Sequence, residues 1–223
     1  MGEAEIQKQD KQFIIHSNIF IYGEAATDAL ALQIAKDIED YWNAPMGTVA
    51  ISDGWFTKKE YRVIFKVDGK FEKELKPETI FTNINPRNNY FRIEEYANGN
   101  ISYVDGINSN TGYFKLQNLL DNSSTAAHEF GHTIGLDHPQ NLDIRGQGTP
   151  GIMYPRGTIV DPQFQYYPDV APGEKGGTLN PFTRKVLQND IDDLKLNNLN
   201  FDDKGFAVLG GFSSIWHDKH IPQ

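Results

Sequence analysis

The sequence predicts an α+β domain in which a mixed sheet with helices comes first and an irregular segment with one further helix follows. Three observations support this class. Short segments of alternating apolar residues lie between positions 13 and 117, helical apolar spacing occurs twice, and a Pro- and Gly-rich stretch precedes the last helix. The 223 residues are enough for one sizeable core, and they contain neither an internal repeat nor a convincing linker, so we expect a single domain over 1–223.

The N-terminal part predicts a strand followed by a long helix. In QFIIHSNIFIYG (12–23) apolar residues fall at roughly alternate positions, which is typical of a strand. In residues 27–44 apolar side chains recur at helical spacing on one face, and Thr27 or Asp28 can cap the start. We therefore expect an amphipathic helix of about four turns.

Several short strands are expected after this helix. Residues 47–52 form one candidate, and residues 60–69 alternate up to a turn predicted at Asp68-Gly69. Asn-Gly and Asp-Gly turns, typical of hairpins at an exposed sheet edge, separate three more candidate strands. These are residues 89–97, 100–106 and 111–117.

The character of the sequence changes after these strands. Asn122, Ser123 or Ser124 can cap a helix that continues through good helix formers until Gly135. Residues 139–180 contain many Pro and Gly and few periodic apolar residues, which predicts a long irregular segment. Loops of this length are usually functional or disordered.

The C-terminal region returns to regular patterns. In NPFTRKVLQNDIDDLKL (180–196) the apolar residues have helical spacing and predict a third helix. GFAVLGGFSSIW (205–216) is too apolar to be a free end, so we expect it to pack against the rest of the domain. His217 and His220, close to the end, are expected to face solvent.

Composition excludes several functions. A net charge of −9 argues against binding to nucleic acid, which needs clustered Lys and Arg, and fits a soluble monomer. No apolar run approaches the roughly 20 residues that span a bilayer, and the start MGEAEIQKQDKQ is too polar for a signal peptide. Because the chain has no cysteine, it has no disulfide or thiolate nucleophile, and any metal site must use His, Asp and Glu.

Half of the six histidines lie within TAAHEFGHTIGLDHP (125–139). His128 and His132 are four residues apart, so a helix places their Cβ atoms about 5–6 Å from each other on one face. Both can then bind one ion at the roughly 2.0–2.1 Å typical of zinc. Gly135 can adopt positive φ, end the helix and turn the chain so that His138 becomes a third ligand. Three protein ligands with a water are typical of catalytic zinc, whereas structural sites have four.

Glu129 directly follows the first histidine and therefore lies beside the metal without being a ligand. That position suits a general base acting on zinc-activated water. A bare H-E-x-x-H also arises by chance among solvated helix residues, but here the pattern extends to H-E-x-x-H-x-x-G-x-x-H, with the glycine where a turn is required. A zinc site that binds without cleaving is a further interpretation, and the presence of Glu129 argues against it.

The stretch HEFGHTIGLDH resembles the zinc-binding signature of the metzincin metallopeptidases. The resemblance implies a Met-turn downstream, and GIMYP supplies Met153, fifteen residues after His138. In the family this methionine underlies the zinc as a hydrophobic floor and does not bind it. The resemblance also implies a metzincin-like zincin, with a twisted mixed sheet and helices above the cleft (about 12–137). An irregular subdomain with one helix (about 138–223) would lie below it.

Within the metzincins the chain resembles the matrixins most, and His138-Pro139 is also similar to the serralysins. Tyr154 directly follows the methionine as in matrixins, whereas astacins and serralysins carry a zinc-reaching tyrosine one position later, where this chain has Pro155. The resemblance thus implies three histidines and water around the zinc, with Tyr154 and Pro155 near the substrate. Matrixins wall the pocket for the substrate side chain after the scissile bond with Pro-x-Tyr. Pro155-Arg156-Gly157 lacks that tyrosine, so specificity does not carry over.

Other matrixin features are missing from the sequence. The chain lacks the cysteine that keeps matrixin zymogens latent, and only His16 precedes the signature, so a second, structural zinc is not expected. His16 itself is expected to be an ordinary strand residue. Residues 103–110 and 201–205 are candidates for Ca²⁺ binding, but their spacing fits no EF-hand or glycine-rich repeat, and ordinary turns are favoured.

Together these patterns predict a zinc metalloendopeptidase with one catalytic Zn²⁺ and with Glu129 as general base and then acid. The resemblance implies a secreted enzyme whose peptide or protein substrate lies extended along an edge strand within 90–114. Two other interpretations stay open. In the first, the chain is the protease-toxin domain of a larger secreted or contact-delivered protein. In the second, it is a zinc-containing binding module that does not hydrolyse peptides.

Overall fold

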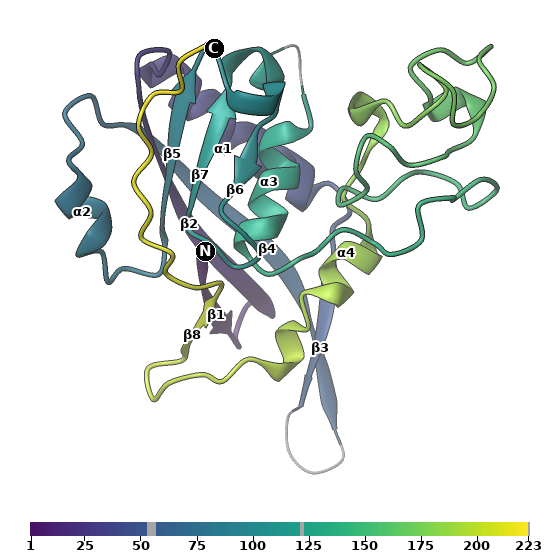
Figure 1. Cartoon of the computed structure of the whole chain (residues 1–223). Coiled ribbons are helices and arrows are strands. Elements are labelled where there is room, and N and C mark those ends of the chain that lie inside the picture. The colour runs from purple at the N-terminus through teal and green to yellow at the C-terminus, as the bar shows by residue number, and fades with distance from the viewer. Residues whose placement is uncertain (53–56, 121–122, 223) are drawn as a thin grey trace.

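The computed structural model describes residues 1–52, 57–120 and 123–222, and it confirms the α+β class. Its main feature is a mixed sheet in the order β3-β4-β2-β5-β7-β6, in which β1 also pairs with β2 and β8 pairs with β1 (Figure 1). The strands are β1 (Gly2–Gln7), β2 (Gln12–Tyr22), β3 (Thr48–Ser52), β4 (Lys58–Phe71), β5 (Asn88–Glu94), β6 (Tyr103–Val104), β7 (Thr111–Lys115) and β8 (Phe206–Leu209).

Strand β2 lies at the centre of this sheet and pairs in parallel with β4 along one side. On its other side the first half pairs with antiparallel β1 and the second half with parallel β5. Beyond β5 comes parallel β7, and the two-residue strand β6 closes that edge in antiparallel orientation. The segment 90–114, expected to carry an edge strand, therefore contains one.

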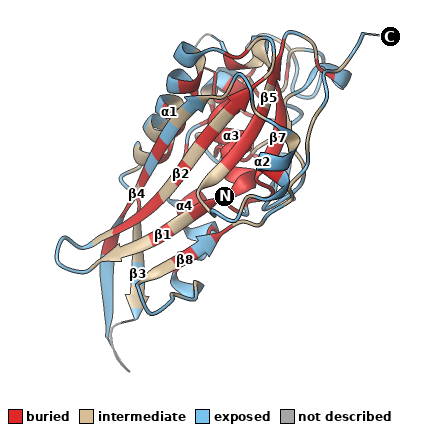
Figure 2. Ribbon diagram, turned by 90° about the vertical axis from the view of Figure 1, so that its left-hand side faces the viewer, coloured by how far each residue is buried: buried red, intermediate tan, exposed pale blue. Residues whose placement is uncertain are grey.

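The helices that matter for the site are anchored to the sheet by aromatic packing. Trp42 lies with its ring centroid 5.0 Å from that of Phe65 in β4 and 6.0 Å from that of Phe130 in the histidine helix. Its indole Nε1 also donates to the Ala127 carbonyl at 3.0 Å. Figure 2 shows buried residues along the central strands and this helix. The four helices of the described residues are α1 (Asp28–Asn43), α2 (Pro77–Phe81), α3 (Thr125–Thr133) and α4 (Gln188–Asp193).

The turn predicted at Asp68-Gly69 is wrong, because β4 continues to Phe71 and both residues pair with β2. A Cβ at Gly69 would lie 2.1 Å from the carbonyl oxygen of Ala31 in α1. The glycine thus allows the helix to approach the strand closely, and it marks tight packing.

Both predicted helix starts have structural counterparts. Thr27 caps α1, and its Oγ1 accepts a hydrogen bond from a backbone N–H of the first turn at 3.1 Å. The N-cap of α3 is Ser124, and Ser123 Oγ accepts from the Thr125 N–H at 3.1 Å. Asn122, the third candidate cap, lies outside the described residues.

Residues 139–180 form bridges, turns and one short 3-10 helix, which agrees with the predicted irregular segment. The segment has a small core of its own, formed by Ile144, Val160 and Leu179. The separate upper and lower subdomains stay a prediction.

The helix predicted over 180–196 is shorter than expected, because α4 begins only at Gln188. Two contacts with distant segments keep the preceding residues extended. The Lys185 N–H donates to the Pro150 carbonyl at 3.0 Å. The Arg184 side chain enters the protein interior, where its Nη1 donates to the Tyr154 carbonyl at 3.0 Å.

The C-terminal tail packs against the domain, as predicted. Strand β8 pairs with β1, and Trp216 stacks on Tyr22 with ring centroids 4.7 Å apart. In Figure 1 the tail, coloured yellow, continues past β5. Among the described helices, none has the length and apolarity required to cross a membrane.

The expectation that His217 and His220 face solvent is wrong. His217 Nε2 lies 2.8 Å from the Asp105 carboxylate, and His220 stacks on Tyr113 with centroids 4.0 Å apart. Both histidines are held because the tail folds onto the sheet. His16 is half-buried in β2, as expected of an ordinary strand residue.

Candidate metal centre

The structure brings the three predicted histidines to one point. His128 and His132 project from α3 and are buried, with 6% and 9% of their surface exposed. Gly135 has φ +107° and ends the helical conformation, and the chain then turns so that His138 returns toward the helix. The Nε2 atom of His138 lies 3.1 Å from Nε2 of His128 and 3.2 Å from Nε2 of His132.

Hydrogen bonds to the other ring nitrogens orient two of these imidazoles. His128 Nδ1 lies 2.7 Å from the Ile152 carbonyl oxygen, and His132 Nδ1 lies 2.8 Å from the Leu136 carbonyl oxygen. A carbonyl oxygen can only accept, so each Nδ1 carries the proton and each Nε2 keeps a lone pair. Burial lowers the pKa of all three histidines, His128 most strongly, which favours their neutral forms.

This donor set fits a metal ion. Two ring nitrogens at about 2.0–2.1 Å from a tetrahedral ion are about 3.3–3.4 Å apart, close to the separations observed. Facing lone pairs repel each other unless a cation lies between them. Among the described residues, potential metal ligands come together in one group of three or more. This group consists of the three histidines, whose ligand atoms lie within 4.8 Å of one another. Imidazole suits several transition metals, of which zinc is one.

The two segments considered for Ca²⁺ contribute no such group. In the 201–205 segment, Asp202 Oδ1 accepts backbone hydrogen bonds from Lys204 and Phe206, both at 2.9 Å. In the 103–110 segment, Asp105 is engaged by Thr111 and His217. Asp202 and Asp105 are therefore engaged by groups of the chain itself.

Glu129 is buried beside the histidines, with 7% of its surface exposed. Burial raises its pKa to about 8, while the charges of Arg184 and Arg156 and a backbone hydrogen bond from Val104 in β6 act in the opposite direction. A carboxyl group with this pKa exchanges its proton near neutral pH, as a general acid–base group must.

A cavity of about 350 Å³ opens onto this group of residues. Its lining joins the start of α3, the loop before β6 and the segment after Met153, and comprises Ile101, Ser102, Asn118, Thr125, His128, Glu129, His138, Pro155, Arg156, Gly157 and Arg184. Pro155, one of the two predicted substrate-binding residues, is part of it. Tyr154, the other, packs instead against the small core of Ile144, Val160 and Leu179.

Met153 packs against the histidine helix. The residue is buried, and a Cβ at Gly131, directly before His132, would lie only 2.4 Å from its Sδ. Ile152, one residue earlier, supplies the carbonyl that orients His128. This segment therefore supports α3 without contributing a group to the three converging nitrogens.

Sequence reasoning missed two buried charged residues near the site. Arg184 Nε and Nη2 donate to Ser124 Oγ at 3.0 and 2.8 Å, and its Nη1 lies 2.9 Å from His128 Nδ1. Asp190 accepts backbone hydrogen bonds from Leu187 at 2.7 Å and from Ile152. Burial lowers the pKa of Arg184 to about 10 and raises that of Asp190 to about 6. No sequence pattern marks Arg184, because its partners are distant in the chain. Asp190 caps its own helix through Leu187, and only its contact with Ile152 connects it to the site.

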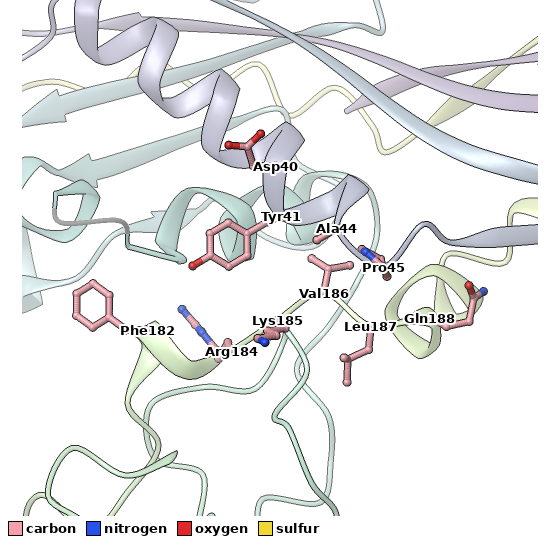
Figure 3. Close-up of a pocket in the computed structure, with 10 residues that line it drawn as sticks. All are labelled: Asp40, Tyr41, Ala44, Pro45, Phe182, Arg184, Lys185, Val186, Leu187 and Gln188. Atoms are coloured by element: carbon pink, nitrogen blue, oxygen red, sulfur yellow. The ribbon is translucent and has the colours of Figure 1, made fainter. Parts of the chain in front are cut away.

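Arg184 also lines a second and larger groove, of about 610 Å³, between the end of α1 and residues 182–188 (Figure 3). Tyr41, Phe182 and Val186 give it a largely apolar wall. Neither the three histidines nor Glu129 reach it, so we assign the chemistry to the smaller cavity.

Comparison with known proteins adds little to this geometry. No protein-family model and no curated protein sequence matches the chain. The solved structure of myroilysin is similar over 89% of this chain and 100% of its own, with 12% identity and a TM-score of 0.38. That likeness is too slight to assign a family or an activity. The site itself therefore gives the stronger indication of function.

Proposed function

We propose that this chain is a zinc-dependent endopeptidase. The observation that carries the proposal is the convergence of three imidazoles on one point, with their Nε2 atoms facing each other. Two of them, His128 and His132, are buried on the helix that also carries the buried carboxyl group of Glu129. His128, His132 and His138 would hold the ion. A bound zinc ion supplies Lewis acidity, which polarises a peptide carbonyl and acidifies water.

The remaining chemistry belongs to the side chains of the cavity. Glu129 accepts a proton from the attacking water and passes it to the leaving amine, so it acts first as base and then as acid. The carbonyls of Ile152 and Leu136 hold two imidazoles in the orientation that the reaction needs. Met153 supports the helix from outside the ligand set, in the role that metzincin methionines play.

Strand β6 is suited to hold the substrate. It is the terminal strand of its sheet edge in the described structure, and it packs near α3. An extended peptide can add to such an edge through main-chain hydrogen bonds. Val104 of β6 contacts Glu129 through its backbone, so a peptide on this edge passes the catalytic group.

The HEFGHTIGLDH signature supports a metzincin of matrixin-like character. In that family a peptide lies extended across a cleft, which fits a protein or peptide substrate here. Secretion and the monomeric state stay predictions.

The decisive experiment combines metal analysis with peptide cleavage. Purified protein should contain one zinc per chain by mass spectrometry and cleave a peptide library in a chelator-sensitive manner. Glu129→Gln and Glu129→Ala should keep the zinc and lose roughly 10²–10⁴-fold in kcat/KM, the usual contribution of a general base. His132→Ala is the matched control, and it should lose the zinc as well as the activity. Near-wild-type turnover by either Glu129 variant would refute the mechanism, and full zinc occupancy without cleavage would favour a binding module.

A further inference from the structure

The catalytic cavity is positively charged although the chain as a whole is acidic. The formal net charge of the chain is −9, yet the residues lining the cavity include two arginines and one carboxyl group. That carboxyl group is Glu129, which has its own role in the proposed reaction. Arg156 and Arg184 are thus left as an excess of positive charge where the substrate must lie.

Arg184 is a buried cation whose hydrogen-bond partners are all formally neutral, and the Glu129 carboxyl acts on its pKa without forming an ion pair. Only 4% of its surface is exposed, and its hydrogen bonds go to Ser124 Oγ and the Tyr154 carbonyl, while its Nη1 also lies 2.9 Å from the His128 ring. Within the described ranges no carboxylate lies at ion-pair distance from its guanidinium. A buried charge without a counter-ion at ion-pair distance is unfavourable, because its lost hydration is not replaced by a close opposite charge.

Arg156 occupies the exposed part of the same cavity, between Pro155 and Gly157. It has no ion pair with any residue that the structure describes. Its effect nevertheless reaches the interior, since its charge acts on the pKa of both Glu129 and Arg184. The two guanidinium groups therefore face a common space, one at its buried end and one at its opening.

We propose that Arg156 and Arg184 form a subsite for an acidic side chain, Asp or Glu, at a substrate position directly flanking the scissile bond. The substrate carboxylate supplies the counter-ion that Arg184 lacks, and Arg156 pairs with it from the solvent side. Guanidinium groups suit this task because their planar donors match a carboxylate. The inference rests on the proposed peptidase function and narrows its substrate class to peptides that are acidic beside the cleavage site.

Matched peptides provide the test. Peptides capped at both ends, so that the side chain is the only variable carboxylate, would carry Asp or Asn, and Glu or Gln, on either side of a cleaved bond. The zinc-loaded protein should prefer the acid over its amide by about 10- to 100-fold in kcat/KM, the range of charge-assisted hydrogen bonds. Arg156→Gln should reduce this ratio severalfold. Arg145→Gln is the control, since Arg145 lies on the same segment, pairs with Asp143 and does not line the cavity.

Binding measurements separate this inference from the peptidase assignment. Calorimetry with the zinc-loaded Glu129→Ala variant should show the same acid-over-amide preference without turnover, and Arg184→Lys should weaken it if zinc content and thermal midpoint are unchanged. An acid-to-amide ratio near one, in a protein that cleaves peptides, overturns the subsite and leaves the peptidase intact. A preference that survives both arginine substitutions also overturns it. Absence of all cleavage with a clear binding preference would instead overturn the peptidase and support the subsite.

Discussion

Gly131→Ala is the substitution that best tests the packing beneath the metal centre. Gly131 lies in α3 directly before His132, and an added Cβ would be 2.4 Å from Met153 Sδ, 3.2 Å from Met153 Cε and 3.3 Å from Trp42 Cζ2. Ordinary nonbonded contacts are about 3.5–4.0 Å. The methionine therefore has to move by about 1–1.5 Å, and it is buried with 3% of its surface exposed.

Two opposing effects determine the size of the change. Overpacking of a core by one methyl group costs about 1–3 kcal/mol. Alanine in place of glycine inside a helix contributes about 0.5–1 kcal/mol in the other direction. We expect a net loss of about 0.5–2 kcal/mol in the free energy of unfolding, near the lower end if the flexible thioether rearranges.

Urea unfolding in a fixed excess of zinc measures this difference. Gly157→Ala is the matched control, since a Cβ there meets no atom within 4 Å, and it should change stability by less than about 0.5 kcal/mol. Met153→Ala alone should cost about 2–5 kcal/mol, and adding Gly131→Ala to it should cost little or restore stability, because the new methyl fills vacated space. If Gly131→Ala stabilises the wild-type protein, Met153 does not pack on the histidine helix and the support described above is wrong.

Three further predictions follow from contacts outside the ligand set. Burial raises the pKa of Asp190 from 3.8 to about 6, so the folded state binds the carboxyl proton more tightly than the unfolded state does. The free energy of unfolding therefore falls as this proton is lost between about pH 4 and 6. Asp190→Asn should remove up to about 3 kcal/mol of that pH-dependent difference, as urea titrations of both proteins at several pH values would show. Gly69→Ala places a Cβ 2.1 Å from the backbone oxygen of Ala31 and should cost more than about 3 kcal/mol, and a thermal midpoint within a few degrees of wild type would contradict this. Trp216→Ala removes the stacking on Tyr22 and should cost about 1–2 kcal/mol, with faster hydrogen exchange confined to residues 210–222.

Elements governed by local pattern could be predicted from the sequence. Helix α1 was expected from its apolar face and its cap, and strand β2 from its alternation, because both signals lie within the segment itself. The errors occur where a distant contact decides the conformation. At Gly69 the approach of α1 extends the strand through an apparent turn, and at Arg184 and Lys185 contacts with other segments delay the start of α4. The same limit applies to His217, whose partner Asp105 is 112 residues away.

In the candidate site, too, the residues that are close in sequence could be predicted and the distant ones could not. The three histidines, Glu129 and Gly135 lie within eleven residues, so helix geometry and one turn suffice to predict that they converge. Arg184 reaches His128 across 56 residues, and the Ile152 carbonyl does so across 24. Nothing in the local sequence indicates either contact, because each depends on how the irregular segment returns to α3.

The ionisation of Glu129 links these two sets of residues. Burial alone favours the protonated carboxyl, which cannot act as a base, whereas the positive charges of Arg184 and Arg156 favour the carboxylate. Under the proposed function, a divalent cation held by the three imidazoles would add two positive charges close by and would lower the pKa of Glu129 in the same direction. Ion binding and the formation of a carboxylate base would then be coupled. The arginines that bias Glu129 in this way are the same groups that we propose to recognise an acidic substrate.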